Sequence, residues 1–159
     1  MFGGGPEHPG LVDYSLEYLN EKVNKSKDTE YLIKMTYSEL YNEEIKDLLS
    51  GSNTGNLKIV DDPNLGPYVQ NITEHAFKDA EGAKKALLEG EERRHFGVTN
   101  MNAHSSRSHV MVRITIECRK VNFEPTNPLR GTWGRDKPTS VATLNLVDLA
   151  GSERANKSG

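Results

Sequence analysis

The feature that most constrains the fold is a regular alternation in HVMVRITIECRKV, residues 109–121. The positions of one parity are aliphatic, namely Val110, Val112, Ile114 and Ile116. Most of the opposing positions are polar, and this period of two predicts a β-strand with one buried face and one wetter face. A second long strand is expected over TSVATLNLVDLAG, residues 139–151, which is apolar enough to predict burial on both faces.

Two helices are expected in the first hundred residues. Residues 11–23, LVDYSLEYLNEKV, follow Pro9-Gly10 and place leucine and valine at roughly helical spacing. Residues 79–95 combine a charged face with a stripe of alanine and leucine. The charged face of this second helix is most simply a surface exposed to solvent.

The segments between these helices predict strands and turns. Residues 30–49 begin with strand-like alternation and end with helix-like spacing of four apolar residues, Leu40, Ile45, Leu48 and Leu49. Residues 57–77 predict short strands, because proline and glycine interrupt them repeatedly. Helices and strands in this order predict an α/β domain.

Composition excludes several classes of protein. The chain has 159 residues and a net charge of −3, so no general basic field predicts binding to nucleic acid or to an anionic membrane. Its single cysteine, Cys118, cannot form a disulfide within the chain. No signal peptide or membrane-spanning apolar run is recognisable in the sequence. We therefore expect a soluble protein in a reducing, cytoplasmic or nuclear compartment.

The second long strand ends in DLAGSE, residues 148–153, which contains a D-x-x-G pattern. An aspartate just past a strand end can hold a magnesium ion, directly or through water. Gly151 allows a backbone N–H to approach a phosphate without an intervening side chain. Such patterns order a segment around the γ-phosphate in nucleotide hydrolases. The pattern alone is weak, because it also arises by chance in strand-to-loop turns.

A second polar stretch, NAHSSRSH, occupies residues 102–109. It is compatible with an ordinary loop and helix cap, because serine and asparagine satisfy free backbone groups there. A serine hydroxyl is also a plausible magnesium ligand, and an arginine is the natural partner for a glutamate such as Glu153. His104 and His109 lack a cysteine or carboxylate at metal spacing, so structural roles are favoured over zinc binding.

Together these two stretches resemble switch I and switch II of the kinesin motor domain. The resemblance extends to PGLV at residues 9–12, YSELYNEEIKDLL at 37–49 and ERRHFGVTNMNAHSSRSHV at 92–110, in kinesin order. Residues 121–139 are the least typical part, and the centromere-associated N-terminal kinesins are the most similar type. The resemblance implies the central part of the kinesin-type P-loop NTPase sheet, with flanking helices and a small β-lobe.

The resemblance also implies ATP and Mg²⁺ as cofactors and assigns residues to them. Ser106 would coordinate magnesium, and Asp148 would hold it through water. Ser105 would help position the attacking water near the γ-phosphate. Asn102 would lie against the nucleotide pocket, and the Gly151 N–H would sense the γ-phosphate.

Two further roles follow from the same resemblance. Arg107 and Glu153 would form a salt bridge between the switches that closes the site for hydrolysis. Arg154 and Lys157 follow switch II and could face acidic tubulin, although isolated surface charges are usually only solvated. The implied partner is the microtubule, with no nucleic acid or membrane, and the parent protein would act in the cytoplasm on the cytoskeleton, the spindle included. It would dimerise through regions outside this chain.

Phosphoryl transfer also needs a glycine-rich loop with a lysine, and no G-x-x-x-x-G-K-[ST] occurs here. We therefore expect residues 1–159 to be a partial motor domain. It would lack the phosphate-binding loop upstream and the main microtubule-binding helix downstream, and would not hydrolyse ATP alone. The alternative is a non-catalytic, kinesin-like module that binds microtubules or another partner. Intact switch residues favour the motor, because a module freed from hydrolysis has no chemical need for them.

Overall fold

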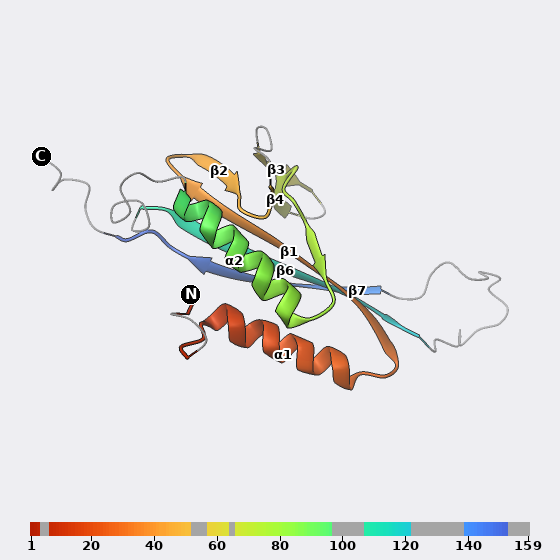
Figure 1. Ribbon diagram of the computed structural model, residues 1–159. Coiled ribbons are helices and arrows are strands. Elements are labelled where there is room, and N and C mark those ends of the chain that lie inside the picture. Colours follow the sequence, from red (N-terminus) through yellow and green to blue (C-terminus); the bar gives the residue numbers. More distant parts are fainter. Residues whose placement is uncertain (4–6, 52–56, 64–65, 97–106, 122–138, 153–159) are drawn as a thin grey trace, which may run out of the picture.

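A computed structural model describes residues 1–3, 7–51, 57–63, 66–96, 107–121 and 139–152 (Figure 1). The helices are α1 (Leu11–Lys25) and α2 (Ala80–Phe96). The strands are β1 (Thr29–Tyr41), β2 (Glu44–Asp47), β3 (Lys58–Asp62), β4 (Gly66–Gln70), β5 (His75–Phe77), β6 (His109–Lys120) and β7 (Thr139–Asp148). The expected helices at 11–23 and 79–95 and the long strand at 109–121 are confirmed. So is the mixed α/β class.

The main sheet has the strand order β2-β1-β6-β7, with β5 also paired to β1. All of these pairings are antiparallel. The strand β6 runs beside β1 from the pair Leu40–His109 to the pair Thr29–Lys120. A separate hairpin of β3 and β4 stands apart from this sheet.

Near the start of each helix, an aspartate accepts a hydrogen bond from a free backbone N–H. In α1 the Gly10 N–H donates to Asp13 Oδ2 at 2.9 Å. In α2 the Gly82 N–H donates to Asp79 Oδ1 at 2.8 Å. Asp79 directly precedes α2, whereas Asp13 lies in the first turn of α1. Both carboxylates satisfy a free donor and interact favourably with the positive end of the helix, so both favour these helix starts.

Both helices contribute to one core on a single face of the sheet, and in Figure 1 α2 lies in front of β1 and β6. The core includes Val12, Leu16, Ile33, Met35, Tyr37, Ala83, Ala86, Leu87, Val110, Val112 and Ile114. The sheet residues among them fall on a single parity of each strand, as the alternation in the sequence predicts. The helices are also joined by Lys84, whose ammonium donates to Glu17 Oε1 at 2.6 Å, and this hydrogen bond raises the pKa of Lys84.

The expectation that residues 139–151 are buried on both faces is wrong. Leu146, on the helix-covered face, is 8% exposed, whereas Val141 and Val147 on the opposite face are 63% and 50% exposed. Leu32 of β1 lies on the same open face and is also exposed. Within the described residues β7 pairs only with β6, and both helices lie on the other face of the sheet.

The helix-like reading of the end of residues 30–49 is also wrong, because a tight hairpin forms there. The partners Tyr41 and Glu44 flank a two-residue turn in which Asn42 and Glu43 both have positive φ, 50° and 64°. This conformation matches the turns that join twisted antiparallel strands. The apolar spacing arises because Leu40 and Ile45 are cross-strand partners rather than neighbours on a helix.

A close contact between α2 and the sheet requires glycine at position 90. A Cβ atom built on Gly90 would lie 2.6 Å from Tyr37 Cδ1 and 3.2 Å from the Leu48 carbonyl oxygen. Real Cβ atoms do not approach other atoms so closely, so any larger residue pushes α2 away from β1. The absence of a side chain therefore sets how closely the helix packs.

We expect Gly90→Ala to destabilise the protein by about 1–3 kcal/mol, because overpacking outweighs the better helix propensity of alanine. The matched control is Gly82→Ala in the same helix, where the nearest atom to an added Cβ is the movable Asp79 Oδ1 at 3.3 Å. Thermal unfolding followed by circular dichroism compares the two variants. A Gly90→Ala protein as stable as the Gly82→Ala protein would contradict the close packing.

Candidate functional site

The described ends of the two polar stretches, residues 107–109 and 148–152, lie at the same end of the sheet. Strands β6 and β7 are antiparallel, and their pairing places Val110 opposite Asp148. Arg107 lies just before β6 and Gly151 lies three residues beyond Asp148. The start of one strand and the end of the other therefore present their adjoining segments side by side.

A direct hydrogen bond joins the two segments. The backbone N–H of Ala150 donates to Nδ1 of His109 at 3.1 Å, across 41 positions of sequence. His109 is the first residue of β6, and Ala150 lies between Asp148 and Gly151. The contact thus ties the turn after β7 to the residue that ends the first polar stretch.

A buried ion pair anchors the first segment to the core. Arg94 of α2 donates from Nε to Glu39 Oε1 at 3.1 Å and from Nη2 to Ser108 Oγ at 3.2 Å. The side chain of Glu39 is 1% exposed and that of Arg94 is 13% exposed. Glu91 adds a carboxylate 3.7 Å from Arg94 Nη1. Ser108, itself buried, is therefore fixed between α2 and β1.

Arg94→Ala removes the arginine that donates to the buried Glu39 carboxylate, so we expect it to lower the free energy of unfolding by about 3–5 kcal/mol. The control is Arg119→Ala, which removes an arginine paired with Glu30 where both side chains are about half exposed. Exposed pairs of this kind contribute about 0–1 kcal/mol. Urea denaturation measures both. Equal, small losses would mean that the Glu39–Arg94 pair is not desolvated as described.

The described candidate residues are open to solvent. The side chain of Asp148 is 50% exposed, and its Oδ2 lies 3.7 Å from the amino group of Met1. Arg107 and Gly151 are also exposed. The other candidates lie outside the described residues: Asn102, Ser105, Ser106, Glu153, Arg154 and Lys157. The Arg107–Glu153 salt bridge therefore stays a prediction.

Among the described residues, no group of three or more histidine, cysteine or acidic side chains could hold a metal ion. Asp148 supplies one oxygen-bearing side chain near the junction of the two segments. Magnesium bound with a nucleotide typically uses only one or two protein oxygens, with phosphates and water completing its shell. A single carboxylate here is therefore compatible with a magnesium–nucleotide complex.

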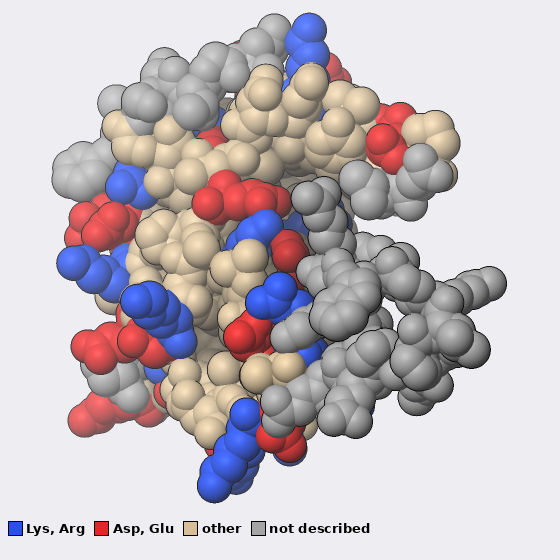
Figure 2. All heavy atoms as spheres, turned by 90° about the vertical axis from the view of Figure 1, so that its right-hand side faces the viewer, with Lys and Arg blue, Asp and Glu red and all other residues tan. Residues whose placement is uncertain are grey.

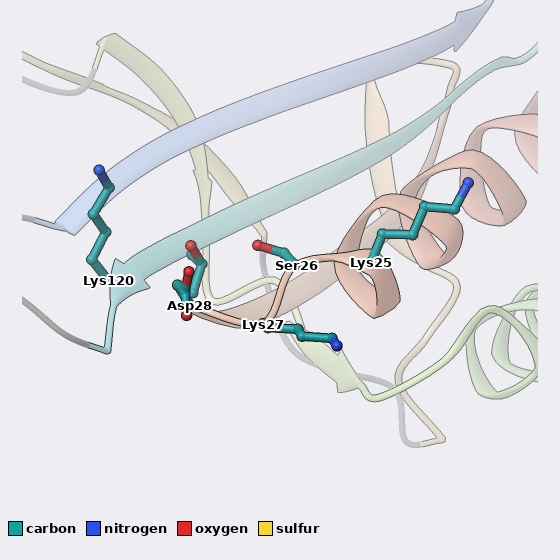
Figure 3. Close-up of a pocket in the computed structure, with 6 residues that line it drawn as sticks. Lys25, Ser26, Lys27, Asp28 and Lys120 are labelled. Carbon is teal, nitrogen blue, oxygen red and sulfur yellow. The ribbon is translucent and has the colours of Figure 1, made fainter.

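A surface hollow of about 550 Å³ lies at the opposite end of β6, lined by Lys25, Ser26, Lys27, Asp28, Thr29 and Lys120. Figure 3 shows that its lysine side chains point in different directions and do not converge on one position. Positive and negative side chains are interspersed over this side of the molecule (Figure 2). The hollow therefore lacks the focused positive charge that would hold phosphates.

Sequence reasoning assigned no role to Glu39, Arg94 or Ser108, and read His109 only as structural. One signal for Glu39 was present in the sequence, because it falls on the same parity of β1 as Ile33, Met35 and Tyr37. A carboxylate among core positions indicates a buried cationic partner. Nothing in the sequence indicates that this partner is Arg94, which lies 55 positions away.

The sequence matches the kinesin motor domain family over residues 1–159. The chain belongs to this family. A solved structure described as that of a fast kinesin superposes with a TM-score of 0.82 at 31% identity, and the match covers 100% of this chain and 42% of that one.

Two curated relatives match almost the whole chain. The chain is 41% identical to the kinesin-like protein KIN-7N of Arabidopsis thaliana over 156 residues, which is 98% of the chain and 18% of that protein. It is 39% identical to centromere-associated protein E of Homo sapiens, covering 98% of the chain and 6% of that protein. The kinesin chain thus spans less than a fifth of either relative.

Neither α1 nor α2 has the length and apolar character needed to cross a membrane.

Proposed function

We propose that this chain is the switch-bearing part of a motor domain, and that the full-length protein hydrolyses ATP to move along or act on microtubules. The observation that carries the proposal is the junction of the β6 start with the β7 end. The Val110–Asp148 pairing and the His109–Ala150 hydrogen bond hold the described ends of the two stretches together, which supports the proposal. Membership of the kinesin motor domain family supports the proposed chemistry.

The proposal gives each candidate residue a specific role. Asn102 and Ser105 contact the nucleotide and the attacking water, while the Gly151 N–H senses the γ-phosphate. The salt bridge of Arg107 with Glu153 closes the two switches over the nucleotide. Closure requires the two segments to start near each other, and the observed register supports this requirement.

The donor set proposed for magnesium consists of the Ser106 hydroxyl and, through water, the Asp148 carboxylate. Hard oxygen donors of this kind suit Mg²⁺, and the exposure of Asp148 leaves room for an intervening water. When bound, the ion neutralises the charge that develops on the phosphates. The protein would contribute by holding these two oxygen donors on the segments that adjoin the start of β6 and the end of β7.

The proposed partner is the microtubule, with Arg154 and Lys157 after switch II as contacts for acidic tubulin. We propose that the protein works in the cytoplasm on the microtubule cytoskeleton. Dimerisation would use regions outside this chain. No nucleic acid or membrane partner forms part of the proposal, because the net charge of −3 provides no general basic field.

The test is an ATPase assay of the full-length protein with Mg²⁺, with and without microtubules. We expect turnover that microtubules accelerate, and a loss of about a hundredfold in Glu153→Ala, the scale seen when one preorganised contact is removed. Glu30→Ala, which removes an exposed acidic residue at the other end of the sheet, is the control and should keep normal turnover. The isolated 159-residue chain should show no motor-like turnover.

Three outcomes would contradict this proposal in different ways. Normal turnover of Glu153→Ala would remove the proposed role of the salt bridge. Robust ATPase activity of the isolated chain would mean that the phosphates are held by residues other than a phosphate-binding loop. A full-length protein that binds microtubules without hydrolysing ATP would favour the non-catalytic module.

A further inference from the structure

His109 stands at the junction of the two switch sequences, yet the proposed mechanism gives it no role. The imidazole Nδ1 accepts the Ala150 N–H at 3.1 Å, so in the neutral ring the hydrogen is carried by Nε2. Ala150 directly precedes Gly151, whose N–H is proposed to meet the γ-phosphate. The imidazole therefore acts on the backbone one residue away from that contact.

The strand ladder does not by itself extend to this turn. The last pair in the register of β6 and β7 is Val110 with Asp148, so Ala150 lies two residues beyond the paired region. Ala150 itself is half-buried, and its hydrogen bond with His109 is exposed to solvent. The His109 imidazole thus holds the two segments together beyond the point where backbone pairing stops.

The acceptor is itself held in a fixed place. His109 follows Ser108, which is 2% exposed and accepts a hydrogen bond from Arg94. Arg94 in turn is paired with the buried Glu39 carboxylate. The imidazole therefore projects from backbone that is anchored to α2 and β1 on one side and to the β6 ladder on the other.

We infer that His109 is a positioning residue: its Nδ1 holds the Asp148–Gly151 turn in register with the end of switch I, so that the Gly151 N–H points at the γ-phosphate. This inference rests on the proposed ATPase function. It gives the last histidine of NAHSSRSH, His109, a role in positioning one switch segment relative to the other. In the proposed mechanism Arg107 and Glu153 form the salt bridge that closes the site. His109 instead sets the distance between the two strand ends from which the switch segments extend.

Two substitutions of similar polarity separate this role from a general structural one. In His109→Asn the side-chain oxygen can occupy the position of Nδ1 and still accept the Ala150 N–H. In His109→Gln the acceptor lies one bond further out, near the position of Nε2, although the side chain is closer in size to histidine. The inference therefore predicts that Asn preserves the attachment and that Gln and Ala lose it.

The first measurement is hydrogen exchange by mass spectrometry on the full-length protein, read on the peptide that contains Ala150. We expect exchange about two- to tenfold faster in His109→Gln and His109→Ala than in wild type, the range for loss of one hydrogen bond. His109→Asn should exchange at the wild-type rate. This measurement needs no ATPase activity, so it tests the attachment even if the proposed function fails.

The second measurement compares nucleotides. Because ADP lacks the γ-phosphate, a misplaced Gly151 N–H should lower kcat for ATP and the affinity for a non-hydrolysable ATP analogue by about two- to tenfold. ADP affinity should stay unchanged in the same Gln and Ala variants. His109→Asn should keep both kcat for ATP and the affinity for the ATP analogue at their wild-type values.

The contradicting results are distinct. Unchanged exchange at Ala150 in both Gln and Ala variants, or faster exchange with normal ATP turnover, would overturn the positioning role. An equal loss of ADP affinity in all three variants, Asn included, would overturn it as well, because that pattern indicates a disturbed fold. Absence of ATP turnover in the wild type would overturn the proposed function and leave exchange to decide the attachment.

Discussion

Strand β6 is the element on which the rest of the described structure depends. It pairs along almost its whole length with β1 on one side and β7 on the other. Its aliphatic parity faces both helices, so it carries the centre of the core. The same strand begins directly after the switch I sequence. Its register with β7 therefore determines both the packing of the domain and the position of residues 107–109 relative to residues 148–152.

A one-residue slip of this register would move Val110, Val112 and Ile114 to the open face and expose the core. The packing that keeps these residues buried therefore also fixes Val110 opposite Asp148. The buried Glu39–Arg94 pair adds a second restraint at the same end, because its geometry ties α2 to β1 and to Ser108. In this fold, the placement of residues 107–109 beside residues 148–152 follows from the hydrophobic register and one desolvated ion pair.

The sequence was most informative where a single local period determined the structure. The alternation of residues 109–121 predicted β6, and the stripe of residues 79–95 predicted α2. It failed at residues 40–49, where two cross-strand partners imitate helical spacing and the positive φ values of Asn42 and Glu43 decide the outcome. It failed again for β7, because exposure depends on which elements cover each face rather than on apolarity alone.

The candidate site was likewise only partly predictable from the sequence. The motifs predicted that Asp148, Gly151 and Arg107 act together. This stays a prediction, and the antiparallel register places their segments side by side. The Glu39–Arg94–Ser108 cluster and the His109–Ala150 link could not be predicted, because each joins residues far apart in sequence through side-chain geometry. In the sequence, such contacts are indicated at most by one polar residue at a position where the alternation of the strand predicts an apolar residue.

The central claim is that the β6–β7 junction brings two switch segments together around a nucleotide. The most direct measurement is a crystal structure of the full-length protein's motor domain with Mg²⁺ and a non-hydrolysable ATP analogue. The account predicts a salt bridge between Arg107 and Glu153, with nitrogen and oxygen within about 4 Å, beside the γ-phosphate and the Gly151 N–H. An ordered, nucleotide-bound structure in which these two side chains lie far apart would contradict it.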